Sequence, residues 1–252
     1  MKTLKSSRLA VLTVSISAAL MLSACQPANE AVETTDASTT TATTTENVAA
    51  ADNAATDANA VDAHAGHDMT GGTMTAMHKE YNDSMTVMHD EMMVGMGYND
   101  PDAAFAQGML GHHIGAVDMA EIQLKYGTDA EMRQLAQEII DAQKSEIEQM
   151  QTWLASNPDA AEPTADTKAM QQAYADGMDA MHEDMMAGIA DPNPDMAFAR
   201  GMLPHHVGAI DMAEVQLKYG KDAEMRQLAE EVIAAQKAEI EQMQNWIATH
   251  GG

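Results

Sequence analysis

The sequence has little of several residue types that particular functions require. It contains one cysteine in 252 residues, so no disulfide can form within the chain and a thiolate-based zinc site is excluded. Lys and Arg total 13 against 39 Asp and Glu, which gives a formal net charge of −26. Such an acidic surface repels nucleic acid and anionic lipid, so neither is expected as a direct partner. Gly-x-Ser-x-Gly and phosphate-loop motifs are also missing, and we expect no catalysis.

Long apolar runs are scarce, and the one that stands out lies at the N-terminus. Three basic residues precede the apolar stretch 9–22, and Leu-Ser-Ala-Cys follows, with the cysteine at Cys25. This is the pattern of a signal peptide over residues 1–24, and it resembles a bacterial lipoprotein box with Cys25 as the lipidated first mature residue. Cleavage there changes the net charge from −26 to −29. We therefore expect a lipid-anchored protein facing the periplasm, and Gln26 after the cysteine favours the outer membrane.

Residues 25–73 lack aromatic side chains and apolar periodicity almost entirely. Their Ala, Thr, Asn, Asp and Glu content cannot bury enough surface to offset the entropy of ordering, which predicts a disordered tether. Near its end lie His64, His67 and Met69, which either hold a metal ion loosely or are incidental residues of a linker. The sequence leaves both interpretations open.

An internal repeat with a constant shift of 93 residues organises the rest of the chain. His113 corresponds to His206 and Trp153 to Trp246, and no gap is needed between the two copies. The first copy spans residues 74–156 and the second 167–249, joined by a turn-rich linker.

Each copy predicts three helices, in the first copy at 74–96, 101–126 and from 128 onward. Apolar residues recur at steps of three and four throughout, and strand signals are absent, so the fold class is all-α with antiparallel neighbours. Thr128 to Glu131 has the spacing of a capping box at the start of the third helix. Gly111 becomes Pro204 in the second copy, which predicts a kink or break there.

Methionine is abundant, with 24 residues, whereas Phe and Trp number two each. A helical bundle can use methionine as adaptable core filler, and this structural interpretation stays open. Three features favour metal binding instead. The first is the presence of histidines one helical turn after methionines, so that sulfur and imidazole share a helix face. These pairs are Met85–His89, Met109–His113, Met178–His182 and Met202–His206.

The other two features are polar residues on apolar helix faces. The His112–His113 step lies on or at the edge of an apolar face, where an unpartnered imidazole is costly, and it is repeated at 205–206. Gln143 and Glu146 interrupt the apolar stripe of the third helix, as Gln236 and Glu239 do in the second copy. Their positions suit hydrogen bonding to, or ligation of, whatever the inward histidines hold.

Thioether and imidazole together form a soft to borderline ligand set. This set suits Cu(I), with Ag(I) as its chemical mimic, and the histidines also accept Cu(II). Calcium and magnesium need oxygen cages, for which no acidic 12-residue loop is present. A di-iron oxidoreductase remains an alternative because such enzymes also use helical bundles. However, no Glu is followed by His three residues later, as that site requires.

The signatures at 108–120 and 201–213, with Gly-Met-Leu-x-His-His-x-Gly-Ala-x-Asp-Met-Ala, carry a family resemblance. Together with Gln-Lys-x-Glu-Ile-x-x-Met at 143–150 and 236–243, they resemble the domain-of-unknown-function-305 family, in two tandem copies. That family includes CopM-like copper-binding proteins of the cell envelope and has a ferritin-like bundle fold. The resemblance implies periplasmic copper binding and copper tolerance. It points at Met109, His112, His113, Met119 and Met150 and at their partners in the second copy.

We therefore expect two tandem ferritin-like antiparallel helical bundles that sequester Cu(I) or hand it to a copper-donor or copper-acceptor protein. The alternative is a structural or interaction bundle without metal; the oligomeric state stays open. The candidate ligands are Met85, Met88, His89, Met92, Met109, His112, His113, Met119, Met150, Met178, Met181, His182, Met185, Met202, His205, His206, Met212 and Met243. The candidate supporting residues are Gln143, Glu146, Gln236 and Glu239.

Overall fold

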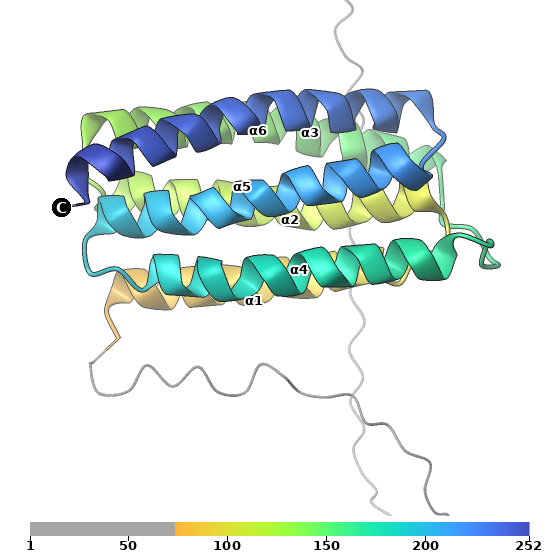
Figure 1. Ribbon diagram of the computed structural model, residues 1–252, viewed down its shortest axis with the longest axis horizontal. Helices are drawn as coiled ribbons and strands as arrows, with labels where there is room; N and C mark the ends of the chain where they lie inside the picture. Colours follow the sequence, from red (N-terminus) through yellow and green to blue (C-terminus); the bar gives the residue numbers. More distant parts are fainter. Residues whose placement is uncertain (1–73, 252) are drawn as a thin grey trace, which may run out of the picture. The chain divides into compact units, whose positions relative to one another are not determined.

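A computed structural model describes residues 74–251, all of whose regular elements are α-helices (Figure 1). The helices are α1 (Ala76–Met96), α2 (Pro101–Tyr126), α3 (Ala130–Ser156), α4 (Thr167–Ile189), α5 (Pro194–Tyr219) and α6 (Ala223–His250). This confirms the predicted all-α helical bundle. Within the described part of the chain, no helix is both long and apolar enough to span a membrane. The predictions that lie outside the described residues are the signal peptide 1–24, Cys25, the tether 25–73, His64, His67 and Met69.

Helix boundaries follow local signals in the sequence, with one exception at the start of α3. Pro101 is the first residue of α2, and the Asp100 side chain accepts hydrogen bonds from the next two free backbone N–H groups. For α3 the capping-box prediction at Thr128 is wrong. Asp129 is the N-cap instead and accepts from the backbone N–H of Glu131 and Met132 at 3.0 Å each. The Thr128 hydroxyl is engaged elsewhere, because it donates to Asp195 of α5.

Pro204 does not break α5, which runs without interruption from Pro194 to Tyr219. The predicted break in this helix is therefore wrong. Proline lacks the N–H that would reach the Arg200 carbonyl four residues earlier. That carbonyl lies against Gly188 of α4, where the absence of a Cβ permits close approach, and Pro204 itself is buried. Packing between the two helices thus holds the backbone in a helical path.

Each repeat forms a stack of three helices, and the two stacks meet through their middle members. α2 contacts α1 and α3, α5 contacts α4 and α6, and α2 packs on α5. Figure 1 shows α2 and α5 in the central layer, with α1 and α4 on one side and α3 and α6 on the other. The buried apolar residues form one continuous core across both repeats. Because α2 and α5 are the central helices, they are the most enclosed, and both His-His signatures lie on them.

Two reciprocal hydrogen bonds give the α2–α5 contact the character of an isologous interface. Gln123 Nε2 donates to Asp195 Oδ1 at 2.6 Å, and Gln216 Nε2 donates to Asp102 Oδ1 at 2.6 Å. A shift of 93 residues converts each bond into the other, as expected for elements related by a two-fold axis. The end of one helix meets the start of the other, so α2 and α5 are antiparallel.

Candidate metal-binding sites

One histidine in each repeat is held by a glutamate of the following helix. His113 Nε2 of α2 lies 2.6 Å from Glu146 Oε2 of α3, and His206 Nε2 of α5 lies 2.6 Å from Glu239 Oε2 of α6. Both imidazoles are 0% exposed, whereas the glutamate side chains are about one-fifth exposed. When the carboxylate accepts a hydrogen bond from Nε2–H, the ring carries its proton on Nε2 and the lone pair on Nδ1 is available. Nδ1 of both histidines is buried without a hydrogen-bond partner.

This arrangement is the one that proteins use to orient a metal-ligating histidine. A carboxylate on the far ring nitrogen fixes both the tautomer and the ring orientation and raises the basicity of the other nitrogen. Met109 precedes His113 by one turn on the same helix face, and Met202 precedes His206 in the same way; both methionines are fully buried. Each central helix therefore offers one oriented imidazole and one thioether to the interior.

The preceding histidine of each signature lies at the two-fold axis instead. The rings of His112 and His205 have their centroids 3.7 Å apart, and their planes are inclined at 44°. Neither ring nitrogen of either residue has a hydrogen-bond partner. Burial lowers the pKa of both imidazoles well below the ordinary value, and the neighbouring histidines lower it further. These two rings are therefore neutral at neutral pH and belong to the interface between the repeats.

The predicted glutamine partners differ from the glutamates. Gln143 and Gln236 are buried, and the Oε1 atom of each has no hydrogen-bond partner. The structure therefore brings Glu146 and Glu239, but not the two glutamines, into hydrogen bonds with the signature histidines.

Most of the predicted methionine ligands lie inside the bundle. Met88 Sδ of α1 packs on α2 where Gly115 has no side chain, because a Cβ there would lie 2.7 Å from the sulfur. Gly208 of α5 accommodates Met181 Sδ of α4 in the same way. Met178, His89 and His182 are half-buried. The buried candidates are Met85, Met88, Met92, Met109, Met119, Met150, Met181, Met185, Met202, Met212 and Met243.

A small methionine-lined pocket lies between the two repeats. Its thioether-bearing lining comes from α1, α4 and α5, and its free volume is about 10 Å³. The site residues predicted from the sequence include neither Met96 nor Tyr174. Neither omission had a local signal, since the pocket forms only when helices of different repeats pack together. The methionines among its lining residues are Met92, Met96, Met178, Met181 and Met212.

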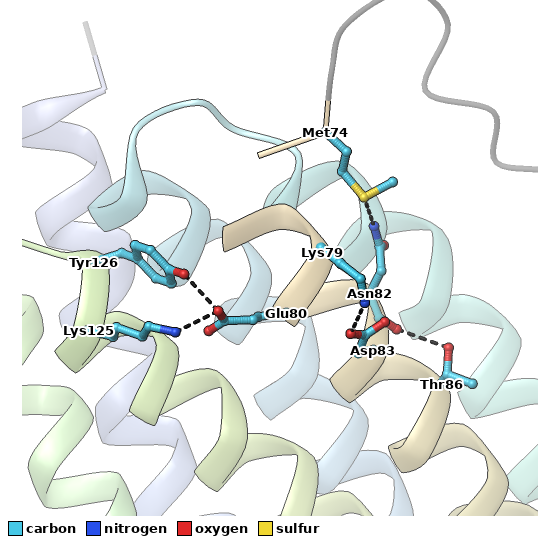
Figure 2. A network of polar contacts seen from close by, with 8 residues as sticks. All are labelled: Met74, Lys79, Glu80, Asn82, Asp83, Thr86, Lys125 and Tyr126. Atoms are coloured by element: carbon cyan, nitrogen blue, oxygen red, sulfur yellow. Dashed lines mark hydrogen bonds and ion pairs between the residues drawn. The ribbon is translucent and has the colours of Figure 1, made fainter. Parts of the chain in front are cut away.

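The surface carries a different kind of network, shown in Figure 2. Glu80 of α1 accepts hydrogen bonds from Lys125 and Tyr126 at the end of α2, and these bonds lower the pKa of its carboxyl group. The exposed thioether of Met74 accepts a hydrogen bond from Asn82 at 3.4 Å. These groups fasten α1 to α2 but do not converge on a point.

Among residues 74–251, no three His, Cys, Asp or Glu side chains are arranged to hold a metal ion.

Comparisons with known proteins find one family model and several solved structures. The domain of unknown function DUF305 matches residues 102–247, a single stretch from α2 to α6 that includes both His-His signatures. The structure titled CopM in the Cu(I)-bound form is 30% identical, with 60% of this chain and 98% of that chain covered and a TM-score of 0.46. The Ag-bound form obtained by soaking is 31% identical, with 60% and 97% covered and a TM-score of 0.46.

A putative secreted DUF305 protein from Streptomyces coelicolor is 26% identical, with 61% of this chain and 94% of that chain covered and a TM-score of 0.49. Among curated proteins, none matches the chain.

Proposed function

The chain belongs to the DUF305 family, and from its buried sulfur and imidazole groups we propose that it is a copper-binding protein of the cell envelope. The proposed role is to sequester Cu(I) or hand it to another protein, and so to contribute to copper tolerance. The family description names no function, so the proposal rests on this chain's own residues. It includes the lipid anchor at Cys25 and the periplasmic orientation that the N-terminal sequence predicts.

The observation that carries the proposal is the pair of carboxylate-oriented histidines. His113 and His206 each have one ring nitrogen on a glutamate and the other buried without a partner. A buried nitrogen without a partner is costly, and a metal ion removes that cost by accepting its lone pair. A fully buried methionine lies one turn away on the same helix in each case and offers a thioether as a second ligand.

Copper(I) fits this environment better than a divalent ion. Neutral thioether and imidazole ligands bring no charge to balance the ion, so a single positive charge in an apolar interior costs less than two. Methionine also remains a usable ligand in an oxidising compartment, where thiols are lost to disulfides. The large negative net charge raises the local concentration of cations around the protein.

Binding without catalysis is part of the proposal. Flexible thioethers allow the coordination of an ion to change during exchange, which suits a carrier. The rival interpretation is a metal-free bundle in which methionine only fills space. The two are distinguished by whether copper uptake depends on the oriented histidines.

The test is an anaerobic Cu(I) titration of the full mature protein against a chromogenic chelator. The wild type is expected to remove Cu(I) from the chelator, and H113Q/H206Q is expected to lose about 10-fold or more in affinity. H78Q/H250Q is the matched control, because it removes two histidines that lie nearer the surface. A wild type that leaves all Cu(I) on the chelator overturns the proposal. If H113Q/H206Q and H78Q/H250Q bind Cu(I) with equal affinity, His113 and His206 are not ligands.

A further inference from the structure

Resting on the proposed copper-binding function, we propose that the pocket between the repeats is a separate thioether site for one Cu(I) or Ag(I) ion. Two of its five methionines, Met92 and Met96, come from the first repeat, and the other three from the second. The first two lie in α1, before residue 102 where the DUF305 match begins. The site therefore combines helices that neither repeat alone, nor the family match alone, contains.

The pocket has room for one ion because two of its glycines have few neighbours. A Cβ placed at Gly108 would meet a single heavy atom within 4 Å, the Met212 Cε at 3.2 Å. A Cβ placed at Gly177 would meet only the Asp211 Cβ, at 3.7 Å. The free volume of about 10 Å³ is near the lower limit for one water molecule, and a bare metal ion is smaller than that.

The five methionines of the lining differ in their exposure to solvent. Met96 and Met178 are partly exposed, whereas Met92, Met181 and Met212 are 3%, 5% and 7% exposed. Two of the five methionines thus retain contact with solvent, whereas three are enclosed. Methionine has three rotatable side-chain bonds, so these sulfurs can turn towards an ion with little movement of the helices.

The chemistry of the lining selects a soft monovalent ion. The only other polar side chain on the lining is Tyr174, whose hydroxyl is buried without a hydrogen-bond partner. Burial raises the pKa of this phenol, and the charge of Asp102 raises it further, so the group stays neutral. An all-neutral, sulfur-rich lining favours Cu(I) and Ag(I) over Zn²⁺ or Cu²⁺, which carry a second charge into apolar surroundings.

The equivalent place in the other half of the molecule is filled. Eight of the ten lining residues have the same type at the position shifted by 93, but Ile189 corresponds to Met96 and Ser84 to Gly177. A Cβ placed at Gly201, the counterpart of Gly108, would meet the Ile189 Cγ2 at 2.5 Å. The repeat thus predicts one thioether site of this kind per chain.

The experiment compares the full mature protein with M96L/M178L, which removes the sulfurs of the two partly exposed lining methionines at nearly constant side-chain volume. Cu(I) is titrated anaerobically against a chromogenic chelator, and Ag(I) is titrated by calorimetry. M74L/M93L is the matched control, because it removes two exposed thioethers, one just before α1 and one within it. The expected result is the loss of one metal equivalent in M96L/M178L and no change in the control.

Three other outcomes overturn the inference and separate it from the proposed function. Copper uptake by M96L/M178L equal to that of the wild type rejects the pocket and leaves the histidine sites. Absence of uptake by the wild type rejects both proposals. In H113Q/H206Q, the remaining ion should show only sulfur neighbours by X-ray absorption, and nitrogen neighbours there reject the pocket. If M96L/M178L fails to fold, M96I replaces it, because isoleucine already occupies the equivalent position 189.

Discussion

The two repeats match at the contact between their central helices, α2 and α5, and differ at the pocket to which the outer helices α1 and α4 contribute. At the α2–α5 contact, Asp102 and Asp195 accept equivalent hydrogen bonds from Gln216 and Gln123. At the pocket, by contrast, one position out of every five differs between the halves. The comparison teaches that the interface constrains both copies together, whereas each outer helix can change by itself.

Even the symmetric contact contains one difference. Besides Gln123, Asp195 accepts hydrogen bonds from the backbone N–H groups of Thr128 and Asp129 and from the Thr128 hydroxyl. Asp102 accepts from Gln216 and from the backbone N–H of Lys221, which stands where the other repeat has Thr128. Asp195 therefore satisfies more donors than Asp102 does.

Substituting these two aspartates should have the largest effect. Hydrogen bonds to a charged group are worth about 1.5–3 kcal/mol each, but bonds to one group are not additive and single substitutions rarely cost more than about 4–5 kcal/mol. We therefore expect D195A to lower the free energy of unfolding by about 3–4 kcal/mol and D102A, which loses fewer bonds, by about 2–3 kcal/mol. Chemical denaturation of the metal-free protein measures both. The control is D90A, which removes an aspartate at an exposed position of α1 and should change stability little. Equal losses for D102A and D195A would mean that the additional donors contribute nothing.

The pH dependence of the free energy of unfolding tests the contact between His112 and His205, at which equivalent residues of the two repeats meet. Burial lowers the pKa of His112 and His205 in the folded state, whereas both titrate near 6.5 when unfolded. Below pH 6.5 the unfolded chain binds protons that the folded chain does not. Stability is therefore fully present above pH 6.5 and is lost as the pH falls, by about 1.4 kcal/mol per histidine and pH unit.

The measurement is chemical denaturation of the metal-free protein at pH values of about 7.5, 6.0 and 5.5, which bracket the pKa of an unfolded histidine. Carboxylates also contribute at acidic pH, so the comparison is with H112Q/H205Q, whose slope should be smaller by nearly two protons. If the substitution leaves the slope of unfolding free energy against pH unchanged, His112 and His205 take up protons in the folded state as well.

Much of this architecture was predictable from the sequence because its determinants are local. Pro101 and Gly127 delimit α2, and the regular spacing of apolar residues gives the helix class. The association of the repeats was not predictable in the same way, since Gln123 and Asp195 are 72 residues apart and carry no local signal of their contact. The same applies to the pocket. Met96 carries no local signal of a site, because the residues that line the pocket with it include members of α4 and α5 in the other repeat.

Glycine substitutions at the pocket and at its counterpart in the other half should cause losses of stability of intermediate size. G208A would place a methyl group against Met181, which lines the pocket, and G115A would place one against Met88, its counterpart. Overpacking costs about 1–3 kcal/mol, so both variants should lose similar stability. Only G208A should also weaken the Cu(I) equivalent assigned to the pocket. Chelator competition and denaturation together measure this, and equal copper affinities would contradict it.

The smallest change in stability is expected where the filled half is converted to resemble the open one. S84G/I189M gives the filled half the glycine and methionine that Gly177 and Met96 supply to the pocket. Ile→Met nearly conserves volume and the glycine weakens a helix by about 1 kcal/mol, so the total loss should be about 1–2 kcal/mol. Both halves of the variant then contain five methionines around a free space. The protein should therefore bind one additional Ag(I) or Cu(I) ion, counted by calorimetric titration. I189M alone supplies the sulfur without the space that removing the Ser84 side chain creates, and it should gain less. If S84G/I189M binds no further ion although it folds, then five thioethers around a small hole are insufficient, and the open half owes its affinity to something other than these two residues.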